Sequence, residues 1–486
     1  MTDHSAPLGP LGDTPPDALR RQLHAMADWV ADYRESIGDR AIVPPVHPGD
    51  VTSGLTPLIP DEPDAMDDIL RDLDAVVMPG IVHWGHPSFL GYFGSTSNGP
   101  ALLGEIAAAA LNVSAMTWRT SPAATELETV VLQWLRDLIG LPAEFTGVVY
   151  DTASVAVLHA LAAARERALP GTRARGLAAR TDVRVQRVYA SDQAHSSLEK
   201  AMIVLGLGEE NVVRIPCDDA FRMDVKALER AISVDRDNGV APLAVIATVG
   251  TTSTASVDPV SEIADVCAAH DLWLHVDAAY GGAMGVLPEG RALLDGLARA
   301  DSVVVNPHKW LFVPLDFSAL FVRRPELLRQ VFALTPEYLE GDAGAGDAVN
   351  YMNYGIQLGR RFRALKAWMV FRAFGRSGLV ARIREHCRLA DVFASYVRAD
   401  PRFALSAPRS MAIVCFRALA PAETEADALN RAIVDAVNAS GEGYLTHTVL
   451  RGRVVMRAGV GNVLTTEEHL GAVWASIVRA LDASTA

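Results

Sequence analysis

Cysteine is scarce in this chain of 486 residues. The four cysteines lie far apart and show neither a CxxC pair nor the spacing of metal ligands. They are Cys217, Cys267, Cys387 and Cys415. This pattern predicts reduced thiols, a cytoplasmic location and no bound metal.

An excess of basic residues is also absent, because 44 Lys and Arg residues face 58 Asp and Glu residues, for a net charge of −14. Nucleic acids and anionic membrane surfaces attract basic faces, so we expect neither as a partner. No apolar run reaches the roughly 18 residues of a membrane helix. Residues 1–16 lack the basic stretch and apolar core of a signal peptide.

Half of the residues are hydrophobic, and the chain is long enough for two or three domains with a large core. Helical patterns mark its N-terminal part. An apolar stripe along residues 18–32 predicts one helix, and residues 64–77 predict a second. A third helix begins at a capping Ser121 followed by Pro122 and ends at Gly140.

From there to Val322, strand-like runs alternate with helical ones, which indicates a mostly parallel sheet covered on both faces. The clearest strand covers residues 243–249. A long amphipathic helix then runs into Arg376, and strands follow at residues 412–416 and 454–457. This last part is typical of a smaller α+β domain.

One lysine stands at a chemically informative position. Lys309 lies in the segment Asn306-Pro307-His308-Lys309-Trp310, directly after the apolar run 303–305. Open α/β sheets bind ligands at the carboxyl ends of their strands. A lysine there can form a Schiff base with an aldehyde cofactor if its pKa is lowered, although a lone lysine after a strand is more often a solvated loop residue.

Two further side chains follow predicted strands. Asp277 ends the run 272–277, where a carboxylate can keep a pyridine nitrogen protonated or can simply cap a turn. His195 follows the run 187–190 and can stack on a flat ring.

These pieces, in this order, resemble the fold-type I enzymes that use pyridoxal 5′-phosphate, and in detail the aromatic-L-amino-acid decarboxylase family of group II decarboxylases. The resemblance runs from about Leu58 to beyond Arg457. It implies an α/β fold with a mostly parallel seven-stranded sheet flanked by helices. It also implies an N-terminal helical dimerisation segment (1–98), a large cofactor-binding domain (99–365), a small α+β C-terminal domain (366–486), and a homodimer with shared active sites.

The resemblance assigns roles residue by residue. Lys309 is the expected Schiff-base lysine, Asp277 pairs with the pyridine nitrogen, and His195 stacks on the ring. Thr252 matches a threonine near the cofactor and the reacting carboxylate, and Ala279 matches the small residue on the other face of the ring.

A phosphate site is expected where the helix 155–168 begins, because helix N-termini favour anions. Plain N-capping by Ser154 is the alternative. The resemblance implies that the phosphate is held by Thr152, Ala153, Ser154, Asn306 and His308. Asp151 departs from the glycine of relatives, and its role stays open.

The glycine-rich acidic stretch after Tyr338 is typical of a mobile lid. In the family, a tyrosine on this lid protonates Cα after carbon dioxide leaves, and Tyr338 matches it. Relatives with phenylalanine there form aldehydes with oxygen. Without the resemblance, the simpler interpretation is that Tyr338 anchors the start of the loop by packing against the protein.

Residues that match the family's substrate pocket are Trp84, Tyr92, Phe93, Ser95, Met116 and Gly359. The aromatic members suit an aromatic substrate, although a core also collects such residues. The Ser95 hydroxyl could bond to a phenolic substrate. Met116 replaces an aromatic residue that the partner subunit contributes in relatives. Gly359 matches a position where plant relatives use glycine for indolic substrates. Arg119 replaces a small residue.

The expected activity is the pyridoxal-phosphate-dependent decarboxylation of an aromatic L-amino acid (tryptophan, tyrosine, phenylalanine or dopa) to the amine and carbon dioxide. Three alternatives stay open: an oxidative route to an aldehyde, a non-aromatic amino acid as the substrate, and a protein that binds the cofactor without catalysis. The product and the aromatic character of the pocket distinguish the first two from the expected activity.

Overall fold

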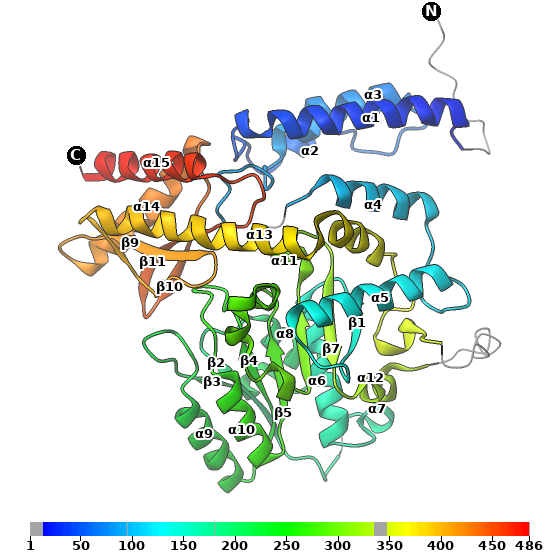
Figure 1. The fold of residues 1–486 in the computed structure, drawn as a ribbon, viewed down its shortest axis with the longest axis vertical. Coiled ribbons are helices and arrows are strands. Elements are labelled where there is room, and N and C mark those ends of the chain that lie inside the picture. The colour runs from blue at the N-terminus through cyan, green and yellow to red at the C-terminus, as the bar shows by residue number, and fades with distance from the viewer. Residues whose placement is uncertain (1–12, 95, 179, 335–347, 486) are drawn as a thin grey trace, which may run out of the picture.

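A computed structural model describes residues 13–94, 96–178, 180–334 and 348–485. Its centre is a seven-stranded sheet in the order β1-β7-β6-β5-β4-β2-β3 (Figure 1). The strands are β1 (Thr146–Tyr150), β2 (Gln186–Ser191), β3 (Val212–Ile215), β4 (Ala241–Thr248), β5 (Trp273–Asp277), β6 (Ser302–Val305) and β7 (Ser318–Val322). Only β7 runs antiparallel to its neighbours, so the predicted mostly parallel sheet is confirmed.

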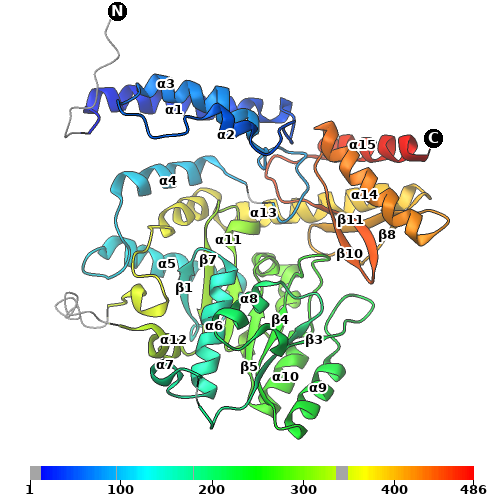
Figure 2. The ribbon, with the colours of Figure 1, turned by 180° about the vertical axis from the view of Figure 1, so that it is seen from behind.

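Helices cover both faces of this sheet. One face carries α6 (Ala153–Ala168), with α8 (Ser197–Val204) and α12 (Pro325–Phe332) packed against it (Figure 2). The helices α5 (Pro122–Ile139), α9 (Val225–Asp237) and α10 (Val260–His270) pack on the other side. The short α7 (Thr172–Arg175) follows α6. Except for the edge strand β3, the strands are buried on both faces, which explains their near-continuous apolar runs.

The C-terminal part forms the predicted α+β layer. Its antiparallel sheet has the order β10-β11-β9-β8. The strands are β8 (Phe403–Leu405), β9 (Ile413–Ala418), β10 (Thr446–Leu450) and β11 (Arg453–Gly459), and the helices are α13 (Ala364–Ala399), α14 (Glu423–Ser440) and α15 (Glu467–Thr485). The helix expected to run into Arg376 continues to Ala399 after a break at Gly375, whose φ is 61°.

The N-terminal helices form a separate layer beside the body of the chain (Figure 1). They are α1 (Pro16–Ser36), α2 (Asp50–Gly54) and α3 (Met66–Asp72), followed by looser turns to Gly80 and by α4 (Gly99–Leu111). The helix predicted over 64–77 is therefore α-helical only in its first half. Among the described residues, no helix combines the length and apolarity needed to cross a membrane.

The predicted cap at Ser121 is wrong, and N-capping by Ser154, the alternative to a phosphate site, does not occur either. Helix α5 does begin at Pro122, but the Ser121 hydroxyl donates to the backbone oxygen of Thr117 at 3.0 Å and does not cap the helix. Ser154 lies in the first turn of α6, and Thr152 occupies the N-cap position without a side-chain cap. The hydroxyls at the start of α6 are therefore not used for capping.

A buried ion pair joins distant segments next to β1. Arg360 and Glu128 are 5% and 2% exposed, and their two hydrogen bonds measure 2.6 and 3.0 Å. Arg360 also donates to the backbone oxygens of Ala115 and Val149 at 2.9 Å. Because every charge here is paired, this cluster fixes α5, the end of β1 and residues 350–360 together.

We expect Arg360→Ala to lower the free energy of unfolding by about 3–5 kcal/mol, because Glu128 would be left buried without its partner. The control is Arg361→Ala, whose pair with Glu105 is exposed and should change stability by about 1 kcal/mol or less. Urea denaturation followed by tryptophan fluorescence measures both. Equal losses in the two variants would contradict this account.

Candidate active site

Four strands of the large sheet deliver the predicted residues to one edge. His195 follows β2, Thr252 follows β4, Asp277 ends β5, and Lys309 follows β6 in the short helix α11 (Pro307–Trp310). Together with the N-terminus of α6 they line a cavity of about 180 Å³. Its walls are Thr152, Ala153, Ser154, His195, Thr248, Gly250, Thr252, Asp277, Ala279, Asn306, His308 and Lys309. The structure therefore brings all the predicted cofactor-binding residues together.

The antiparallel strand β7 holds the lysine turn in place. The Ser318 hydroxyl donates to Asn306 Oδ1 at 2.7 Å, and the Phe317 N–H donates to His308 Nδ1 at 3.0 Å. The Lys309 N–H donates to the backbone oxygen of Asn306 at 2.9 Å. Backbone and side-chain bonds thus direct the Lys309 side chain to the cavity.

Lys309 differs from the other three lysines of the chain. Lys200 and Lys226 are exposed, and Lys366 is paired with Glu105 at 2.5 Å. Burial lowers the pKa of Lys309, Asp277 opposes this shift, and Arg457 adds to it. Burial lowers the pKa of Lys366 as well, but the Lys366 amine is held by Glu105. The Lys309 amine lines the cavity and is therefore the one available to react as a neutral nucleophile.

Asp277 lies close enough to Lys309 and His195 to favour the charged forms of both groups. Asp277 Oδ1 accepts the Ala279 N–H at 3.0 Å. Burial lowers the pKa of His195, Asp277 raises it, and Lys309 lowers it. His195 Nδ1 accepts the Ser197 N–H at 3.1 Å, which places the proton of the neutral ring on Nε2.

The donor set of this cavity fits pyridoxal phosphate. The start of α6 offers N–H groups and hydroxyls for an anion. Asp151 does not line the cavity, and its Oδ1 accepts the Thr152 N–H at 2.7 Å. The buried Thr248 hydroxyl has no hydrogen-bond partner in the structure, so an acceptor or donor can still be accommodated beside Asp277, its register partner in β5. An amine, a carboxylate and an anion site thus surround one space.

A second cavity of about 670 Å³ adjoins the first and shares His195, Thr252, His308 and Lys309 with it. Its aromatic wall contains Trp84, Tyr92, Phe93 and Tyr444. The rings of Trp84 and Tyr92 stack at 5.3 Å, and the hydroxyls of Tyr92 and Tyr444 are 3.3 Å apart. Lys309 Nζ lies 4.8 Å from the centre of the Phe93 ring.

The other predicted site residues are placed differently. Met116 and Gly359 line neither cavity of this single chain, and the Met116 backbone oxygen accepts the Met352 N–H at 3.1 Å. Ser95 and Tyr338 lie outside the described residues. No cluster of metal-ligating side chains occurs among the residues that the structure describes.

Arg457 is a residue of this site that the sequence patterns did not reveal. It is 4% exposed, and its Nε donates to the backbone oxygens of Thr252 and Ser253 at 3.1 Å. Its Nη1 donates to the Tyr92 backbone oxygen at 2.6 Å, and its guanidinium lies 4.8 Å from the centre of the Phe93 ring. The available signal was a basic residue inside the predicted buried strand 454–457. Arg457 connects the aromatic wall to the Thr252 loop.

Comparisons with known proteins find similar sequences and structures over almost the whole chain. The family model described as the pyridoxal-dependent decarboxylase conserved domain matches residues 48–419. Tryptophan decarboxylase 2 of Oryza sativa subsp. japonica is 40% identical over 469 residues, which are 94% of this chain and 93% of that protein. Phenylacetaldehyde synthase of Arabidopsis thaliana is 38% identical over 470 residues, which are 94% of each protein. The crystal structure of Oryza sativa TDC with PLP and tryptamine matches with a TM-score of 0.94 at 37% identity, covering 99% of this chain and 100% of that chain.

We expect pyridoxal phosphate followed by borohydride to label Lys309 in preference to Lys200 and Lys226, because its lowered pKa leaves more neutral amine. Labelling should rise with pH, with a midpoint below 10.5, the ordinary pKa of lysine. Peptide mass spectrometry measures the label on each lysine. Lys226→Ala is the control that should keep the label on Lys309, and Lys309→Ala should lose it. An even spread over the three lysines would refute this assignment.

Proposed function

This chain belongs to the pyridoxal-dependent decarboxylase family, and we propose that it converts an aromatic L-amino acid into the corresponding amine and carbon dioxide. The observation that carries the proposal is the aromatic cavity that opens onto Lys309. Aromatic side chains bury most favourably against other rings. The relatives named for tryptophan decarboxylation and for an aromatic aldehyde support the same substrate class.

Pyridoxal phosphate, when bound, supplies an electron sink for the negative charge that remains at Cα when carbon dioxide leaves. The proposed roles of the chain's own residues follow from their positions. Lys309 holds the cofactor through its amine, and Asp277 keeps a proton on the ring nitrogen. His195 and Ala279 bracket the flat ring, and Thr252 lies beside the leaving carboxylate.

The phosphate end is proposed to rest on the N-terminus of α6. Ala153 and Ser154 provide N–H groups there, Thr152 and Ser154 provide hydroxyls, and Asn306 and His308 close the opposite wall. The rings of Trp84, Tyr92 and Phe93 offer an apolar surface against which the substrate side chain is proposed to pack.

Proton return to Cα is proposed for Tyr338, with His195 as a second donor. A hydroxyl at this position supports the amine as the product. A second candidate, oxidation to an aldehyde, is favoured by the 38% identity to a phenylacetaldehyde synthase. Tyr338 weighs against it, because the family's aldehyde-forming members carry phenylalanine there.

The holoenzyme incubated with L-tryptophan, L-tyrosine, L-phenylalanine and L-dopa should release an amine and carbon dioxide, detected by mass spectrometry of the products. Lys309→Ala should reduce turnover by about 10³-fold or more, because the covalent anchor is lost. Lys226→Ala, an exposed lysine on α9, should leave turnover unchanged. An aldehyde product in place of the amine would contradict the proposed role of Tyr338. Turnover of non-aromatic amino acids alone would refute the proposed aromatic substrate class.

We also propose a cytoplasmic homodimer with shared active sites, divided into segments 1–98, 99–365 and 366–486. Four free cysteines support a reducing compartment. Helix α1 buries no residue within its own chain, and Leu19 and Leu23 are 44% and 48% exposed. An apolar stripe of this kind is typical of an interface. Met116, which lines neither cavity of one chain, is proposed to contribute to the partner's site, as the family resemblance implies.

Sedimentation should give a mass of two chains of 52.0 kDa each. Leu19→Glu with Leu23→Glu should shift the protein towards monomers, because two charges would enter an apolar interface. Arg21→Glu, on the opposite side of the same helix, is the matched control and should leave the dimer intact. A monomeric wild-type protein would overturn the proposal.

A further inference from the structure

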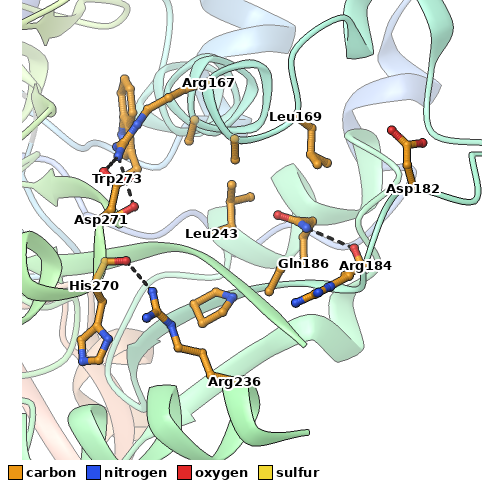
Figure 3. Close-up of a pocket in the computed structure, with 14 residues that line it drawn as sticks. Arg167, Leu169, Asp182, Arg184, Gln186, Arg236, Leu243, His270, Asp271 and Trp273 are labelled. Carbon is orange, nitrogen blue, oxygen red and sulfur yellow. Dashed lines mark hydrogen bonds and ion pairs between the residues drawn. The ribbon is translucent and has the colours of Figure 1, made fainter. Parts of the chain in front are cut away.

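A cavity of about 430 Å³ opens at the amino ends of β2, β4 and β5 (Figure 3). Gln186, Ala241 and Trp273, the first residues of these strands, line it. The cofactor cavity lies at the other end of the same strands. Because β4 runs from Ala241 to Thr248, about 23 Å at 3.3 Å per residue, the two cavities are separate sites.

Arginine gathers at this cavity although the chain carries a net charge of −14. Arg167 is compensated, because it forms an ion pair with Asp271 at the cavity wall. Arg184 and Arg236 form no ion pair with any described residue.

The remaining carboxylate at the cavity does not neutralise them. Asp182 is held by Arg180, which lies outside the cavity, through hydrogen bonds of 2.6 and 3.0 Å. Two guanidinium groups therefore lack an anionic partner.

Helix dipoles explain part of this arrangement. Arg236 donates to the backbone oxygen of His270, the last residue of α10, at 2.6 Å, and cations are favoured at helix C-termini. That bond uses one of five guanidinium N–H donors. Arg184 forms no side-chain hydrogen bond with the described residues. Figure 3 shows Arg184 and Arg236 along one side of the cavity and Arg167 on the opposite side.

Aliphatic side chains form part of the lining between these arginines. Leu169, Pro242 and Leu243 line the cavity, with Leu169 half-buried and Leu243 buried. Figure 3 shows Leu169 and Leu243 between the arginines. An ion without an organic part would leave this surface uncovered. The cavity is thus shaped for a molecule with an anionic end and a carbon skeleton.

We propose that this cavity is a binding site for a small organic dianion, either a phosphate monoester or a dicarboxylate, whose charged group is held by Arg184 and Arg236. Guanidinium groups bind the oxygens of both anions through paired, charge-assisted hydrogen bonds. The half-buried side chain of Leu169 contacts the carbon skeleton. The proposal does not depend on which amino acid the enzyme decarboxylates.

Isothermal titration of the holoenzyme tests it, with glycerol 3-phosphate and succinate as probes. A saturated cofactor site prevents binding of the phosphate probe there. We expect saturable binding of one molecule per chain, and the probe that binds more tightly identifies the class. Arg184→Ala with Arg236→Ala should weaken binding about tenfold or more.

Arg230→Ala is the matched control, because Arg230 is exposed on the same helix as Arg236 and does not line the cavity. Its affinity should stay within about twofold of wild type. Should the double variant fail to fold, Arg184→Ala alone carries the test, because the Arg184 side chain makes no hydrogen bond to be lost. Absence of saturable binding of either probe at ~10 mM, or equal binding in the arginine variant, would overturn the proposal.

Discussion

A neutral amine next to a carboxylate is the constraint around which the cofactor cavity is arranged. The proposed chemistry needs Lys309 without its proton, whereas Asp277 favours the protonated form. Burial works against Asp277, and the Arg457 guanidinium adds to the effect of burial. Each unit of pKa is worth about 1.4 kcal/mol, so entry of water into the cavity would shift the Lys309 amine towards its protonated form. The buried strands and the ring of Phe93 therefore belong to the chemistry as much as the charged groups do.

The aromatic wall depends on residues far from it in the chain. Arg457 in β11 holds the Tyr92 backbone oxygen, and the Asn462 side chain holds two further backbone oxygens in residues 85–86. The same Asn462 accepts at its backbone oxygen from His386, whose other ring nitrogen accepts the indole N–H of Trp310 at 2.9 Å. Burial lowers the pKa of His386 to about 4, which keeps this acceptor neutral. The lysine turn, the N-terminal segment and the C-terminal domain thus share one chain of hydrogen bonds.

Strand ends were the part of the site that could be predicted from the sequence. The apolar runs before His195, Asp277 and Lys309 correspond to β2, β5 and β6, and parallel strands bring their carboxyl ends to one edge. The antiparallel insertion of β7 between β1 and β6 could not be predicted, because an apolar run carries no information on direction or order. Yet β7 supplies the bonds that fix the lysine turn.

Polar contacts between distant segments could not be predicted from the sequence either. Glu128 and Arg360 are 232 residues apart, and each alone reads as a surface charge. Periodicity reports which face of an element is apolar but not what covers that face. Helix α1 shows this best: its stripe predicted burial, yet Leu19 and Leu23 stay exposed in one chain. Since exposed apolar area costs about 25 cal/mol per Å², this exposed stripe supports the proposed homodimer, in which a second copy of the chain offers an identical stripe.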